Sequence, residues 1–113
     1  MKKKATDHPG PAHLRPETAA WYLAVHQTYV LEEHHSRLLL AAAEQWDRAT
    51  AAREAIDRHG LTYLAGESQT PRPRPEIKIE YDSKVLFSRL LRELALDLAP
   101  PPEAPRPPRR GGQ

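Results

Sequence analysis

The chain has 113 residues, 28% of them charged, with a formal net charge of +2 and no cysteine. This length fits a single domain and leaves no room for a catalytic domain together with a separate regulatory one. The missing cysteine excludes disulfide bonds and cysteine-ligated zinc.

The prolines divide the sequence into segments. Twelve prolines fall in three groups, at positions 9–16, 71–75 and 100–108. Helices can run in the proline-free stretches between these groups. We expect a basic N-terminal arm over 1–15, a helical domain over 16–98 and a proline- and arginine-rich tail over 99–113. The helical domain would hold roughly 83 residues, a size at which a single core is marginal and oligomerisation often supplies the missing burial.

Both ends of the chain are basic and the middle is not. Residues 1–15 carry a net charge of +3 and residues 99–113 of +2, whereas residues 16–60 carry −3. Basic, disordered arms attract nucleic acid because their lysines and arginines displace counterions from phosphates. Charge alone leaves open a second interpretation, in which the arms only aid solubility. The C-terminal tail cannot bury a core and is expected to be disordered or polyproline-like.

No segment is expected to lie in a membrane. The longest apolar run, at 38–43, is far below the roughly 20 residues that a membrane-spanning helix requires. Lys2, Lys3 and Lys4 are followed by Asp7 and His8 rather than by the apolar region of a signal peptide. We therefore expect a soluble intracellular protein.

The first predicted helix runs from Pro16 to about Tyr29. Proline suits the first helical position because its missing N–H has no helical partner there, and Glu17 complements the helix dipole. Arg15 is a poor N-terminal cap. Small and apolar side chains recur on one face of this helix, at Ala20, Trp21, Ala24, Val25 and Thr28.

A longer helix is predicted from about Glu33 to His59, ended by Gly60. At 1.5 Å per residue it is roughly 40 Å long, so the first helix cannot cover it. An apolar seam runs along one side of this helix, and three acidic residues are expected in water, away from the seam. The uncovered part of this seam favours self-association. The acidic residues are Glu44, Asp47 and Glu54, and the seam consists of Leu39, Ala42, Trp46, Ala49 and Ile56.

A third helix is predicted over 75–97, after an extended piece at 61–63 and a polar, proline-containing loop at 66–74. Alternating apolar and charged residues over 76–82 are typical of a strand, but a longer apolar pattern with helical spacing includes them, and its length favours a helix. The predicted fold class is therefore all-α, with a short, a long and a C-terminal helix and disordered basic tails. The longer pattern consists of Ile79, Leu86, Leu90, Leu91 and Leu94.

No catalytic or metal site is expected. On a helix the adjacent His34 and His35 would point about 100° apart, so they could not ligate one ion from the same face. The serines are in no nucleophile-elbow context, and the folded region has too few glycines for a phosphate-binding loop. We expect a non-enzymatic protein without a metal or cofactor, so that any ATP hydrolysis belongs to a partner.

The two tryptophans admit two interpretations. They could stack on nucleic-acid bases, but their position on the apolar stripes favours a core location, near each other between the first two helices. We expect the core and the contacts between copies to use Trp21, Leu39, Ala42, Trp46, Ala49, Ile56, Leu90, Leu91 and Leu94.

An exposed basic pair, Arg72 and Arg74, lies near the body of the protein. This pair could contact phosphate or only keep the loop hydrated, and the sequence favours neither. The candidate DNA-binding residues are Lys2, Lys3, Lys4, Arg72, Arg74, Arg106, Arg109 and Arg110, the last three serving either DNA or a protein partner.

The order of several motifs resembles a known family. They are Leu14-Arg15-Pro16-Glu17 leading to Trp21, a long helix centred on Ala42-Ala43-Glu44-Gln45-Trp46, Gly60-Leu61-Thr62-Tyr63, and Arg74-Pro75 followed by Leu90-Leu91-Arg92-Glu93-Leu94. Over residues 13–98 this order is similar to that of the small, non-catalytic terminase subunits of tailed double-stranded DNA phages. The chain departs from the family pattern where Arg74-Pro75 replaces a histidine–proline pair and where prolines follow the last helix.

The resemblance implies a ring-like homo-oligomer in the host cytoplasm. Such a subunit binds the packaging site of viral double-stranded DNA, then recruits and regulates a large subunit that holds the ATPase and nuclease. The sequence leaves open the subunit number, the DNA sequence recognised, which tail meets the large subunit, and whether DNA threads or wraps the ring. The alternative is a helical protein–protein adaptor or antitoxin-like regulator whose tails never meet DNA.

Overall fold

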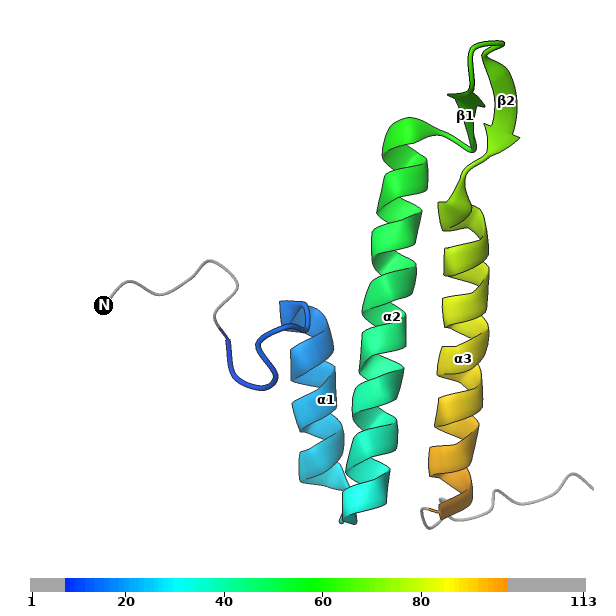
Figure 1. Ribbon diagram of the computed structural model, residues 1–113. Helices are drawn as coiled ribbons and strands as arrows, with labels where there is room; N and C mark the ends of the chain where they lie inside the picture. Colours follow the sequence, from blue (N-terminus) through cyan, green and yellow to red (C-terminus); the bar gives the residue numbers. More distant parts are fainter. Residues whose placement is uncertain (1–7, 98–113) are drawn as a thin grey trace, which may run out of the picture.

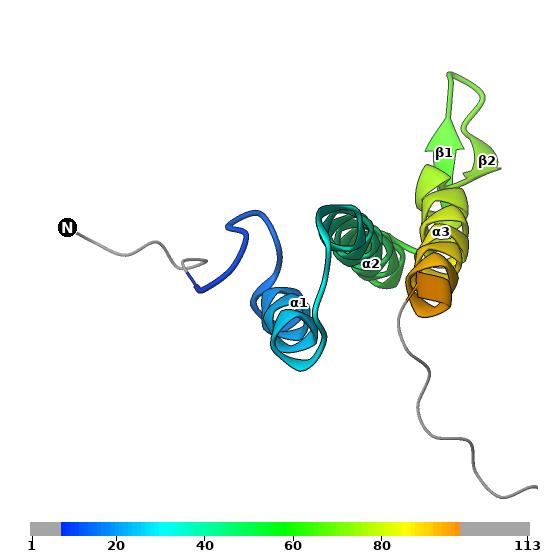
Figure 2. The ribbon, with the colours of Figure 1, turned by 90° about the horizontal axis from the view of Figure 1, so that it is seen from below.

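The computed structural model describes residues 8–97, which form three helices and one two-stranded hairpin in the order α1, α2, β1, β2, α3. In both Figure 1 and Figure 2, α2 lies between α1 and α3. The hairpin stands at the end where α2 passes into α3 (Figure 1). The expectation of a mainly helical chain is confirmed. None of the helices in this described part is long and apolar enough to cross a bilayer.

Helix α1 spans Pro16–Thr28, one residue short of the predicted end. Arg15 precedes it and supplies no side-chain cap, as its chemistry predicts. The start of the helix is instead fixed from α2, because Asp47 accepts hydrogen bonds from the backbone N–H of Arg15 (2.8 Å) and from the hydroxyl of Thr18 (2.6 Å). A carboxylate at a helix N-terminus also complements the helix dipole.

Helix α2 spans Glu33–His59, as predicted. Gly60 ends it with a φ of 88°, in the region that favours glycine, and its N–H donates to the carbonyl of Ile56. The buried side chains of α2 are mostly small, which lets its neighbours approach closely. They include Leu39, Ala42, Ala43, Ala49, Ala52 and Ile56.

Residues 61–74 form a hairpin where the sequence predicts an extended piece and a loop, so the expectation of an all-α fold is wrong at this point. Strand β1 (Thr62–Ala65) pairs antiparallel with β2 (Thr70–Pro73). Hydrogen-bonded and non-hydrogen-bonded pairs alternate in such a ladder. The N–H of Arg74 donates to the carbonyl of Leu61, so Pro71 and Pro73 take the alternate positions that need no N–H.

Helix α3 spans Pro75–Asp97, which settles residues 76–82 as helical. It runs antiparallel to α2 and packs against it far more extensively than α1 does (Figure 1). Part of the predicted core is confirmed, because Leu39, Ala42, Ala49, Ile56 and Leu94 are buried within one chain. The expectation that much of the α2 seam stays uncovered is wrong, since α3 supplies the cover that α1 is too short to give.

Candidate interaction site between the three helices

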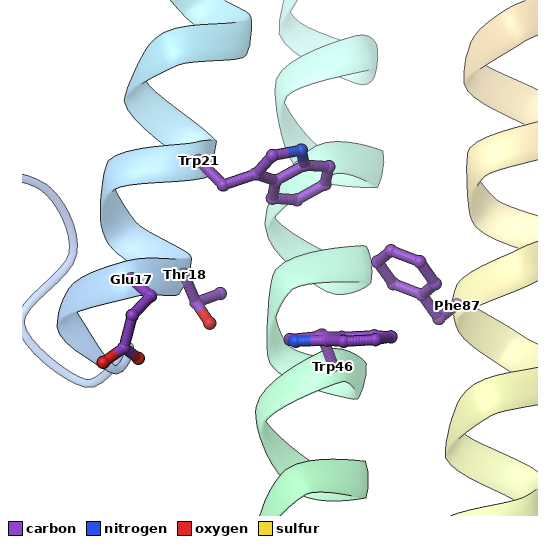
Figure 3. A pocket seen from close by; sticks show the side chains of 5 residues that line it. All are labelled: Glu17, Thr18, Trp21, Trp46 and Phe87. Atoms are coloured by element: carbon purple, nitrogen blue, oxygen red, sulfur yellow. The ribbon is translucent and has the colours of Figure 1, made fainter.

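An aromatic groove lies between α1 and α3, over α2. Glu17, Thr18, Trp21, Trp46 and Phe87 line it, and its volume is about 330 Å³. Figure 3 shows the rings of Trp21, Trp46 and Phe87 pointing into this space, one from each helix, with Glu17 and Thr18 on the α1 side. The three helices thus leave a largely apolar hollow of the kind that binds ligands or peptides.

Phe87 joins the two tryptophans. Its ring centroid lies 5.0 Å from that of Trp46 and 6.0 Å from that of Trp21, in tilted arrangements that aromatic pairs favour. The predicted proximity of the tryptophans holds in the sense that they share one groove. The prediction of a core position is wrong for Trp46, which is 45% exposed because Phe87 covers only one part of its ring.

An ionic cluster lies next to the groove, and Trp46 also lines the hollow that contains it. Arg53 donates two hydrogen bonds to the carboxylate of Glu80, at 3.0 and 2.8 Å, and Lys84 donates a third at 2.9 Å. Glu80 is only 7% exposed. The two cations compensate the charge that burial would otherwise leave without a partner.

These contacts shift the acidity of the groups involved. Hydrogen bonds from Arg53 and then Lys84 lower the pKa of Glu80 below its ordinary value of 4.5, against the opposing effect of burial. The same hydrogen bond with Glu80 raises the pKa of Arg53. Glu80 therefore stays charged well into acidic solution, and the cluster ties α3 to α2 beside the groove.

A row of carboxylates on α2 holds the segment that precedes α1. Glu54 receives two hydrogen bonds from the guanidinium of Arg15, at 2.8 and 2.9 Å, and Glu44 pairs with His13 at 2.8 Å. Asp47 lies between these contacts and binds Arg15 and Thr18. The prediction that the three acids only face water is wrong. The contact with Arg15 also lowers the pKa of Glu54.

The two arginines of the predicted basic pair have different surroundings. Arg74 donates to the backbone carbonyls of Gly60 (3.1 Å) and Thr62 (3.4 Å), so it fastens the hairpin to the end of α2. Arg72 is exposed on β2, opposite Tyr63 on β1. Of the two, Arg72 is better placed for an outside partner.

Glu32, His34 and His35 bring ligand atoms within 4.8 Å of one another at the start of α2. The sequence expectation that the two histidines point apart is wrong, because their ring centroids lie 4.1 Å from each other. His35 is also buried. Its Nδ1 accepts the backbone N–H of Glu32 at 3.1 Å, one half of a capping box. These contacts stabilise the start of α2. The expected lack of a metal or cofactor stays a prediction.

Six of the predicted DNA-binding residues lie outside the described residues: Lys2, Lys3, Lys4, Arg106, Arg109 and Arg110. The tail over 99–113, with its predicted disorder, and residues 1–7 of the predicted arm also lie outside them. The other predicted contact residues of α3, Leu90 and Leu91, are half-buried. Comparison of the chain with protein-family models, with curated proteins and with solved structures gave no match.

Proposed function

We propose that this chain is a non-catalytic, DNA-binding assembly subunit of the terminase small subunit kind. In this role a homo-oligomer binds the packaging site of viral double-stranded DNA in the host cytoplasm. It then recruits and regulates a large subunit that supplies the ATPase and nuclease. The proposal rests on the resemblance of the motif order and on the surface of α3.

The observation that carries the self-association is an apolar face of α3. Tyr81 is 69% exposed and Leu86 is also exposed. Together with Val85 they line a shallow hollow of about 390 Å³, with Asp82 and Arg89 at its sides. An apolar patch with a charged border is typical of a protein-binding surface. We assign it to contact with a second copy of the chain.

A ring needs two different contact surfaces on each copy, so that one side of a subunit meets the other side of the next. Helices α1 and α3 lie on opposite sides of α2 (Figure 2). Ala20 and Ala24 lie on the exposed face of α1 and are small enough to admit a close neighbour. We propose that the apolar face of α3 packs against this face of α1 in the next copy.

The basic residues support the DNA part of the proposal. Residues 1–15 and 99–113 both carry net positive charge, and Arg72 is exposed on the hairpin. Each phosphate contact of this kind is weak, but a ring repeats it once per subunit, and linked contacts multiply in strength.

Light scattering of the full chain tests the proposal, at low and high salt, with and without duplex DNA. We expect a species of many subunits that resists salt and gains DNA mass at low salt. Tyr81→Ser should reduce the subunit number, whereas the control Tyr63→Ser, on the hairpin, should not. A monomer or dimer that is indifferent to DNA would contradict the proposal and favour a protein–protein adaptor.

A second experiment tests the N-terminal arm. Replacing Lys2, Lys3 and Lys4 together by Gln should weaken binding equally for all DNA sequences. The slope of log affinity against log salt should flatten by about 0.9 for each phosphate that the arm no longer neutralises. Lys78→Gln, on α3, is the control. An unchanged slope in the arm variant removes the arm from the DNA interface.

A further inference from the structure

The aromatic groove and the C-terminal tail of the same chain have matching chemistry. We propose that the segment over 99–110 docks, as a polyproline helix, into the aromatic groove between α1 and α3 of its own chain. The inference is independent of DNA binding and of the subunit number. It rests on the shape of the groove, on charge, and on the length of chain that follows α3.

The shape of the groove suits a proline-rich segment. A polyproline helix makes no internal hydrogen bonds and binds where aromatic side chains form a groove for its rings. Trp21, Trp46 and Phe87 supply such side chains from three separate helices (Figure 3). The exposed fraction of Trp46, 45%, is surface that proline rings could cover. The segment offers six prolines, at positions 100–102, 105, 107 and 108.

Charge distinguishes the two ends of the groove. The exposed carboxylate of Glu17 lies at its α1 side. Beyond Trp46, by contrast, the cations Arg53 and Lys84 are already paired with Glu80. The tail has three arginines and a single acid, so its arginines are attracted to the carboxylate of Glu17. Arginine also stacks favourably on indole rings.

The chain is long enough to reach. Helix α3 ends at Asp97, at the end of the molecule where α2 begins (Figure 1). From there back to Phe87 the helix rises about 15 Å, at 1.5 Å per residue. Five residues of polyproline helix cover about the same distance, at 3.1 Å each. If residues 98–102 span this distance, then Pro105, Pro107 and Pro108 fall over the groove. A segment attached so close to its site has a high effective concentration, so weak contacts suffice to hold it.

Tryptophan fluorescence of the full chain tests the proposal, because the sequence has only two tryptophans and both line the groove. In one variant Ser replaces the six prolines over 100–108, and in another Gln replaces Arg106, Arg109 and Arg110. We expect both variants to show red-shifted emission and stronger quenching by acrylamide than the wild type. The control Arg72→Gln removes an exposed arginine of the hairpin and should leave both readouts unchanged.

A synthetic peptide of residues 99–110 should protect the tryptophans of the Pro-to-Ser variant from acrylamide. Adding Glu17→Gln to that variant should weaken the affinity for the peptide by roughly two- to fivefold, the range that the loss of an exposed ion pair gives. Equal quenching of the wild type and the Pro-to-Ser variant would overturn the proposal, as would a peptide that gives no protection. If the tryptophans of the wild-type protein become more strongly quenched when the protein is diluted, the tail binds the groove of another copy. That result would contradict docking within one chain.

Discussion

Arg53 of α2 and Glu80 of α3 meet in a two-point contact across the helical pair, with hydrogen bonds of 3.0 and 2.8 Å. The parallel donors of the guanidinium match the two carboxylate oxygens, so the contact fixes direction as well as distance. It is one of the contacts that hold α3 in its position along α2. In this position Phe87 lies beside Trp46, and both rings line the aromatic groove.

The pH dependence of stability follows from this contact. Because the pKa of Glu80 lies below its ordinary value of 4.5 in the folded chain, the stabilisation is fully present above pH 4.5 and is lost as the pH falls through the lower, folded value. Glu80→Gln should therefore be less stable at neutral pH and lose less on acidification. Arg53→Ala should behave in the same way, since Arg53 is the main cause of the shift. Urea unfolding over this pH range gives the comparison, and a wild-type acid slope in both variants would contradict it.

Asp47 holds the start of α1 through the N–H of Arg15 and the hydroxyl of Thr18. Asp47→Ala removes both hydrogen bonds to a charged acceptor, and we expect it to lower the free energy of unfolding by about 2 kcal/mol. Glu44→Ala is the matched control, because its pair with His13 is largely exposed and should contribute at most about 1 kcal/mol. Urea titration followed by circular dichroism measures both. Equal losses of unfolding free energy in the two variants would show that Asp47 stabilises the fold no more than an exposed carboxylate does.

Leu39 is 1% exposed and is the largest fully buried side chain among the described residues. Leu39→Ala leaves a cavity that the surrounding helices fill only in part, and we expect a loss of about 3 kcal/mol. Leu64→Ala removes the same atoms from an exposed position of the hairpin and should change stability little. Thermal unfolding of the two variants separates these outcomes. A small loss for Leu39→Ala would mean that the core can close around the missing atoms.

Arg72 and Arg74 should differ in what their loss affects. Arg72→Ala is expected to leave the Tm unchanged and to reduce the salt slope of DNA binding by about 0.9, the value for one phosphate contact. Arg74→Ala is expected to lower the Tm, because its guanidinium donates to two carbonyls where the hairpin meets α2. A lower Tm for Arg72→Ala, together with an unchanged salt slope of DNA binding, would contradict these separate roles.

The helices could be predicted from the sequence because a local signal marks one boundary of each helix. Pro16 and Pro75 start two helices, and Gly60 stops the long one, so each boundary depends on one residue and its nearest neighbours. The hairpin could not be predicted in this way. In the sequence, Pro71 and Pro73 indicate a break in regular structure. The strand accommodates them because they alternate with Arg72 and Arg74, whose N–H groups face β1.

The interaction site depends on contacts between distant parts of the chain, and periodicity does not contain that information. A helical seam predicts that Trp46 turns toward a neighbour, but it does not predict that Phe87 covers one part of the ring and leaves the rest exposed. In the same way, the spacing of acids along α2 indicates a polar face. It does not indicate that Arg15, far away in sequence, binds Glu54 on that face.

The register of the hairpin also limits how these chains can aggregate. Since Arg72 and Arg74 direct their N–H groups toward β1, the backbone nitrogens on the open edge of β2 belong to Pro71 and Pro73, which carry no hydrogen. An incoming strand from another molecule would find carbonyl acceptors there and no donors. This edge therefore cannot act as a template for an extended intermolecular sheet, even when oligomerisation brings many hairpins close together.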